Sequence, residues 1–99
     1  GIALWKSDGT RGGTKIVKSF DTGAAYNNDP SRFLNANGTL YFCAYESASG
    51  WELWKSDGTE SGTKLVTELY PGPNDGVSGN NCQLAYLDSK VFFAGIDAT

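Results

Sequence analysis

The stretch Leu53-Trp54-Lys55-Ser56-Asp57-Gly58-Thr59 decides the fold, because the same seven residues also stand at positions 4–10. Gly-Thr-Lys recurs as well, at 13–15 and 62–64, and both pairs of copies lie 49 positions apart (54 minus 5; 63 minus 14). A period near fifty residues, built from short apolar runs and Gly-rich turns, is typical of stacked all-β units that cannot bury their apolar faces alone. The sequence therefore divides into two units, residues 1–49 and 50–99.

Alternating apolar residues between turn signals predict four antiparallel strands in each unit. We expect them at 2–6, 15–20, 32–35 and 39–45, and again at 51–55, 64–69, 82–87 and 90–96. Asn37-Gly38 supplies the positive φ of a tight hairpin turn, and Asp88-Ser89 takes its place in the second unit. The hairpin strands are 51 positions apart (92 minus 41), so the second unit has a longer loop around Pro71-Gly72-Pro73.

The segments Thr39–Tyr45 and Val91–Ala94 are apolar at successive positions, which indicates strands that are covered on both faces. Blades of a β-propeller are covered in this way by their neighbours, whereas a two-sheet sandwich predicts cleaner alternation. We expect an all-β, β-propeller-like fold with two four-stranded antiparallel blades. Because a closed propeller needs roughly four to eight blades, other copies of the chain or further repeats in a longer polypeptide would have to complete it.

Composition excludes several classes of function. Eight Lys and Arg stand against eleven Asp and Glu, with no basic cluster, which argues against nucleic-acid binding. No run approaches the ~20 apolar residues of a membrane span. The chain has no His, so Ser-His and Cys-His nucleophile pairs and common zinc sets are missing. A glycosidase-type carboxylate pair remains, but the spacing of Glu46, Glu52, Glu60 and Glu68 selects none, and we expect no enzyme activity.

The sequence resembles a known family. The run 52–59, continued by Gly-Thr-Lys-Leu-Val at 62–66 and Pro71-Gly72, resembles the ELWxxDGT repeats of large secreted bacterial surface proteins, and the segment 37–42 resembles their hairpin. The first unit departs from this pattern at Ala3, where Glu is expected, and in the loop Asp21-Thr22-Gly23. The resemblance covers essentially the whole chain. It implies a propeller-like arrangement, export to the cell surface, and a structural or adhesive role without enzyme activity.

Asp8 and Asp57 are the most prominent repeated polar residues. A repeated carboxylate in a Gly-rich turn is a candidate Ca²⁺ ligand, but the spacing of a calcium-binding loop is absent. Asp in such turns commonly accepts hydrogen bonds from its own backbone. We therefore interpret Asp8-Gly9-Thr10 and Asp57-Gly58-Thr59 as structural turns and expect no cofactor, with calcium as the alternative.

Two further features leave alternatives open. Cys43 and Cys82 either form one disulfide, as in an oxidising compartment, or are two buried thiols. Asn37-Gly38-Thr39 satisfies the N-glycosylation sequon, but Asn-Gly is also the pair that a tight hairpin prefers.

Aromatic side chains supply the candidate binding residues. Trp5, Trp51 and Trp54 are either wedges between blades or platforms for sugar rings, and repetition at equivalent positions favours packing. Candidate ligand contacts in or near loops are Tyr26, Tyr45, Tyr70 and Asn74. The sequence thus predicts a non-enzymatic extracellular scaffold or adhesive module of a cell-surface or filamentous assembly. The alternative is a lectin-like propeller that binds glycans or surface polymers through its loops.

The two ends of the chain match each other in the repeat. Residues 93–99 align with 42–48, and residues 1–5 align with 50–54. The end of one copy is therefore expected to continue into the start of another with almost no gap.

Overall fold

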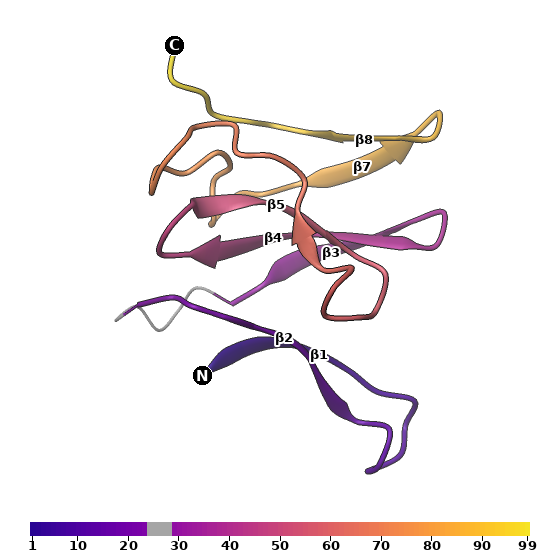
Figure 1. Ribbon diagram of the computed structural model, residues 1–99. Coiled ribbons are helices and arrows are strands. Elements are labelled where there is room, and N and C mark those ends of the chain that lie inside the picture. Colours follow the sequence, from indigo (N-terminus) through magenta and orange to yellow (C-terminus); the bar gives the residue numbers. More distant parts are fainter. Residues whose placement is uncertain (24–28) are drawn as a thin grey trace.

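The computed structural model describes residues 1–23 and 29–99, and this part of the chain is all-β (Figure 1). The strands are β1 (Ile2–Lys6), β2 (Lys15–Phe20), β3 (Ser31–Ala36), β4 (Thr39–Glu46), β5 (Gly50–Ser56), β6 (Lys64–Leu65), β7 (Leu84–Leu87) and β8 (Lys90–Phe93). Every strand pair is antiparallel. The prediction of an all-β chain with antiparallel sheets is confirmed.

The strands form three sheets that are stacked face to face. The pair β1-β2 lies on one side of a four-stranded sheet of order β3-β4-β5-β6, and the pair β7-β8 lies on the other side (Figure 1). We call the space between β1-β2 and the central sheet the first layer, and the space between the central sheet and β7-β8 the second layer.

The four-stranded sheet does not coincide with either of the units 1–49 and 50–99. Its strands β3 and β4 come from the first unit, and β5 and β6 come from the second. The short turn at the boundary between the units pairs β4 directly with β5. This pairing runs without a break from Leu40↔Ser56 to Glu46↔Gly50. Instead of two four-stranded sheets, the described residues form one four-stranded sheet and two two-stranded sheets, which we call half-sheets.

Strand β6 is shorter than the predicted segment 64–69. In the first unit, Phe20 pairs with Ile2 at the end of β2. At the equivalent place in the second unit, the Trp51 carbonyl instead accepts the amides of Gly76 (2.7 Å) and Val77 (3.2 Å). The longer second loop thus replaces the end of β6 at the sheet edge.

Both hairpin turns have the predicted backbone geometry. Asn37 and Gly38 have φ of 55° and 91°, and Asp88 and Ser89 have φ of 53° and 62°. Two successive residues with positive φ match the right-handed twist of the flanking strands. The non-glycine pair Asp88-Ser89 thus adopts the same turn as Asn37-Gly38.

The first layer contains the main hydrophobic core. Its buried members are Leu4, Val17, Phe20, Phe42, Ala44 and Trp54. Phe20 contacts Trp54 edge-on, with ring centroids 5.0 Å apart, and Phe42 at 6.1 Å. Such edge-to-face pairs add to the stabilisation from area burial. Side chains from sequence-distant strands therefore hold β1-β2 against the central sheet.

The second layer contains a smaller cluster of Cys43, Val77 and Cys82, flanked by Trp51, Leu84 and Phe93. Cys43 and Cys82 form a disulfide, which resolves the alternative that the sequence left open. The bond fastens the segment before β7 to the central strand β4. Disulfides persist in non-reducing environments, so the bond indicates an environment of that kind. Within residues 1–23 and 29–99, no helix is long and apolar enough to cross a membrane.

Candidate functional site

A groove lies where the β6–β7 loop faces β5 and the start of β3. Its volume is about 760 Å³. It is lined by Asp29, Ser31, Arg32, Trp51, Asp75, Ser78, Gly79, Asn80 and Ile96. We call it the loop groove.

Trp51 organises one wall of the loop groove. Its amide donates to Asp75 Oδ1 at 2.9 Å, and its carbonyl accepts the amides of Gly76 and Val77. Gly79 packs directly on the indole, where a Cβ atom would lie 2.2 Å from Cε2. The loop can approach the ring this closely only because residue 79 has no side chain.

The chemistry of the loop groove suits a neutral, polar ligand. Arg32 offers donors, Asp29 and Asp75 offer acceptors, and Asn80 offers both. Arg32 has φ of 61°, an uncommon conformation for a non-glycine residue. Ligand sites combine a few convergent polar groups with aromatic surface, and a carbohydrate presents hydroxyl groups to the first and C–H faces to the second.

The predicted ligand contacts lie elsewhere. Asn74 donates from Nδ2 to the Pro71 carbonyl at 3.1 Å, so its side chain shapes the loop. Tyr70 is half-buried, and Tyr45 packs against Trp51 with ring centroids 6.0 Å apart. Tyr26 falls outside the described residues. Sequence reasoning missed Arg32, Asp75 and Asn80, and the signal that points to that loop is the run of glycines at 72, 76 and 79.

The two Asp-Gly-Thr turns have nearly identical internal geometry. Asp8 Oδ1 accepts from the Thr10 amide at 3.0 Å and from the Thr10 hydroxyl at 2.6 Å, and Asp57 accepts from Thr59 at 2.9 and 2.6 Å. These hydrogen bonds lower the pKa of both carboxyl groups, the hydroxyl bond most. The contacts are those of a self-contained Asx-type turn.

A glycine lies close to the carboxylate in each turn. A Cβ atom on Gly13 would lie 1.9 Å from Asp8 Oδ1, and one on Gly62 would lie 2.0 Å from Asp57 Oδ1. Residues 13 and 62 must therefore be glycine for each turn to bring its backbone this close to the exposed carboxylate. No group of three or more His, Cys, Asp or Glu side chains able to hold a metal occurs in the described part of the chain.

Glu52 is a buried carboxyl group. It is fully inaccessible to solvent, and its Oε1 has no hydrogen-bond partner among the described residues. Burial raises the pKa of Glu52, while the Leu69 amide, which donates to Oε2 at 3.4 Å, acts in the opposite direction. Glu68 and Asp75 lie close enough to raise it further. A side chain in this position cannot reach a polysaccharide substrate.

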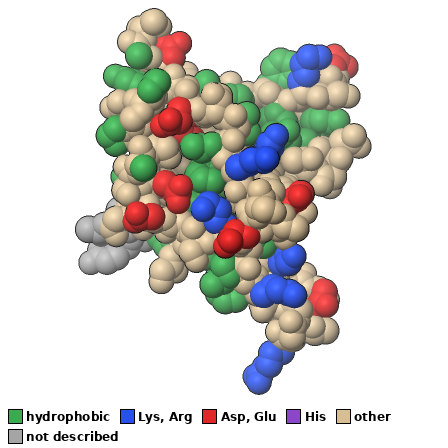
Figure 2. Space-filling model, viewed as in Figure 1, with side chains coloured by type: hydrophobic (Ala, Val, Ile, Leu, Met, Phe, Trp, Pro, Cys, Tyr) green, Lys and Arg blue, Asp and Glu red, His purple; other side chains and the backbone are tan. Residues whose placement is uncertain are grey.

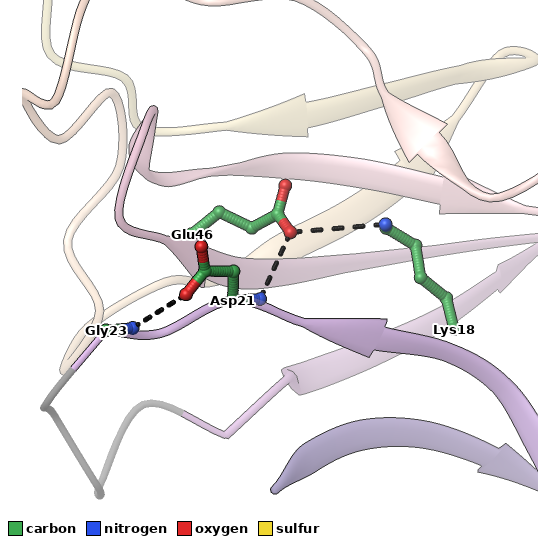
Figure 3. Close-up of polar contacts among 4 residues, drawn as sticks. All are labelled: Lys18, Asp21, Gly23 and Glu46. Carbon is green, nitrogen blue, oxygen red and sulfur yellow. Dashed lines mark hydrogen bonds and ion pairs between the residues drawn. The ribbon is translucent and has the colours of Figure 1, made fainter.

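Glu46 connects the central sheet to the end of β2 (Figure 3). Its Oε2 accepts from the Asp21 amide at 3.3 Å and lies 4.0 Å from Lys18 Nζ, while Asp21 Oδ1 accepts from the Gly23 amide at 3.1 Å. The Ser47 amide also donates to the Asp21 carbonyl at 2.8 Å. These contacts fasten the end of β2 to the β4–β5 turn.

Asn37, the candidate glycosylation residue, is exposed at the tip of the β3–β4 hairpin. The adjacent Gly38 amide donates to Asn35 Oδ1 at 2.9 Å. The turn is therefore stabilised by Asn35, and glycosylation of Asn37 stays a prediction.

Comparison of the chain with protein-family models, with curated proteins and with solved structures gives no match. The resemblance to ELWxxDGT repeats therefore rests on the residues quoted for it.

Proposed function

We propose that the chain is a non-enzymatic scaffold or adhesive module that works outside the cell, as part of a propeller-like repeat assembly. The observation that supports this most is the exposure of large apolar side chains in the two outer sheets. Trp5, Ile16, Tyr86, Leu87 and Phe92 are 41 to 60% exposed. Trp5 and Ile16 are paired neighbours on the outer sheet β1-β2, and exposed apolar neighbours of this kind are typical of association sites.

The positions of Glu52 and Glu46 also favour a module without catalysis. Glu52 is inaccessible, and Glu46 is bound to the β2 end. The disulfide suits a module that must stay folded in a non-reducing environment.

Retention of the chain on surfaces tests this proposal. Beads that carry the folded chain are passed over films of bacterial envelope polysaccharide and over films of the chain itself, beside beads with the reduced and alkylated chain. We expect retention under flow for the folded chain and no release of soluble sugar. Equal retention of both kinds of bead, or release of product from the film, would contradict the proposal.

A second candidate, a lectin, is favoured by the loop groove. Asn80 lines the groove, whereas its neighbour Asn81 does not, and both side chains are exposed. On a glycan array, a lectin would give a signal that Asn80→Ala removes and the control Asn81→Ala retains. Asn74→Ala tests the contact predicted from the sequence. Binding lost equally in all three variants would argue against recognition in the groove.

A further inference from the structure

The two outer half-sheets have complementary free edges. In the sheets described here, β1 pairs only with β2, and β8 pairs only with β7. In the central sheet, the equivalent strands β5 and β4 pair with each other. β1 shares Leu-Trp-Lys with β5 at equivalent positions, and β7-β8 repeats the turn and register of β3-β4. The two half-sheets thus correspond to the two halves of one four-stranded sheet.

We propose that β8 of one copy pairs with β1 of a second copy of this chain, giving a sheet of order β7-β8-β1-β2. The inference rests on the proposed scaffold function and names its partner. The β4–β5 register predicts the pairing, because Tyr41↔Lys55 and Phe42↔Trp54 become Phe92↔Lys6 and Phe93↔Trp5. Glu46↔Gly50 becomes Asp97↔Gly1 at the other end.

The second layer shows the place that Trp5 would fill. In the first layer, Trp54 is 3% exposed and packs with Val17 and Phe20. The equivalents of Val17 and Phe20 are Val66 and Leu69, and Val66 is 42% exposed, compared with 5% for Val17. Leu69 already lies against Gly95, the equivalent of Ala44. In the described part of the chain, the second layer has no side chain at the place that Trp54 fills in the first layer. Trp5 of a second copy is the equivalent residue, and it is 57% exposed in the single chain.

The free edge of β1 has room for the incoming strand. An open groove of about 450 Å³ is lined by residues 1–5 together with Asp29, Pro30 and Phe33. On the other half-sheet, apolar side chains are visible beneath the β7–β8 hairpin, at the upper right of Figure 2. Strand β8 ends at Phe93, although its equivalent β4 continues through Glu46, where β5 supports it. Residues 94–97 are held to the β6–β7 loop by the Ile96 amide, which donates to the Gly76 carbonyl at 2.7 Å, and an added strand would extend β8 into this segment.

Each added copy would complete one sheet and supply the next free edge. This head-to-tail contact is heterologous, so it closes into a ring or continues as a filament. Because each copy contributes one complete sheet and two halves, rings of two to four copies hold about four to eight sheets, the range of closed propellers.

Cysteine cross-linking tests the register. Chains carrying Lys6→Cys are mixed with chains carrying Phe92→Cys under mild oxidation. The matched control replaces Phe92→Cys by Val91→Cys, which is one residue out of register and on the opposite face of the strand. Each chain has one added thiol, so any new bridge between positions 6 and 92 joins two molecules. We expect the mixed dimer to form about tenfold faster for the pair 6/92 than for 6/91, because opposed residues lie within disulfide reach.

Two further measurements keep the test decisive. If Phe92→Cys does not fold, the pair Gly1→Cys and Asp97→Cys tests the same predicted register at the ends of the chain. Light scattering of the unmodified chain should give two or more copies of 10.6 kDa with rising concentration, and Trp5→Ala should abolish this association. A folded chain that stays monomeric, or cross-linking without preference for the predicted register, would overturn the inference. Retention on polysaccharide without cross-linking would leave the scaffold proposal standing and remove this one.

Discussion

The first and second layers use equivalent positions of the repeat but are closed by different means. In the first layer, the ring of Phe20 on β2 packs edge-on against the ring of Trp54 on β5. In the second layer, the corresponding tryptophan is absent, and the Cys43–Cys82 disulfide joins the sheets instead. The repeated residues therefore determine each strand and turn locally. Whether a repeated side chain is buried depends instead on whether the sheet beside it has all four strands.

Replacing the tryptophan of each unit should give the largest difference in stability between the two layers. Trp54→Ala should destabilise the chain by about 3 to 5 kcal/mol, because it opens a cavity in the first layer. Trp5→Ala should change the stability of the dilute chain by less than about 0.5 kcal/mol, because the side chain is exposed there. Urea unfolding at low protein concentration measures both. Equal losses would show that the two tryptophans have the same surroundings.

Removing the disulfide should act on the second layer. Because Cys43 and Cys82 are 39 positions apart, the double variant Cys43→Ala/Cys82→Ala should lose about 2 to 4 kcal/mol, mainly through the greater freedom of the unfolded chain. Hydrogen exchange should show faster opening of β7-β8 than of β1-β2. If β1-β2 opened first, the two layers would not be independently closed.

The strands and turns could be predicted from the sequence because local chemistry determines them. Asn37-Gly38 and Asp88-Ser89 form the predicted hairpin turns, and both Asp-Gly-Thr turns form with matching contacts. The sheet boundary could not be read from the repeat, since a period does not say where a sheet begins. The loop groove was missed because it joins residues such as Arg32 and Asn80, which are distant in sequence and are not conserved between the two units.

Glu52 offers a pH test that only the second unit can show, because the first unit has Ala3 at the equivalent position. Burial raises the pKa of Glu52 in the folded chain above its ordinary value of 4.5. The folded state therefore retains a proton that the unfolded chain has released, and this group's contribution to stability falls as the pH rises through the folded pKa. We expect Glu52→Gln to remove that loss and raise the urea midpoint at neutral pH more than at acid pH.

The Asp-Gly-Thr carboxylates provide the control for Glu52. Hydrogen bonds from Thr59 lower the pKa of Asp57, so its contribution is present above the ordinary pKa and is lost as the pH falls through the folded value. Glu52→Gln should leave this acid-side loss unchanged. A uniform shift of the midpoint at every pH would show that Glu52 acts by packing and not by its charge.

The smallest expected effect comes from the most closely matched pair, Ser7 and Ser56. Both hydroxyls lie 2.7 Å from a threonine hydroxyl and accept an amide two residues later at 3.0 Å. Ser56 is 2% exposed, whereas Ser7 is exposed. Ser56→Ala leaves the Gly58 amide without its buried partner and should cost about 1 to 2 kcal/mol, while water can replace the hydroxyl in Ser7→Ala, which should cost about 0.5 kcal/mol or less. Because the hydrogen bonds are the same, a difference in urea unfolding isolates the effect of burial, and equal costs would assign the stability of both turns to their local geometry alone.

In an assembled sample, the cost of Ser7→Ala should rise toward that of Ser56→Ala, since the second copy would cover Ser7 as β4 covers Ser56.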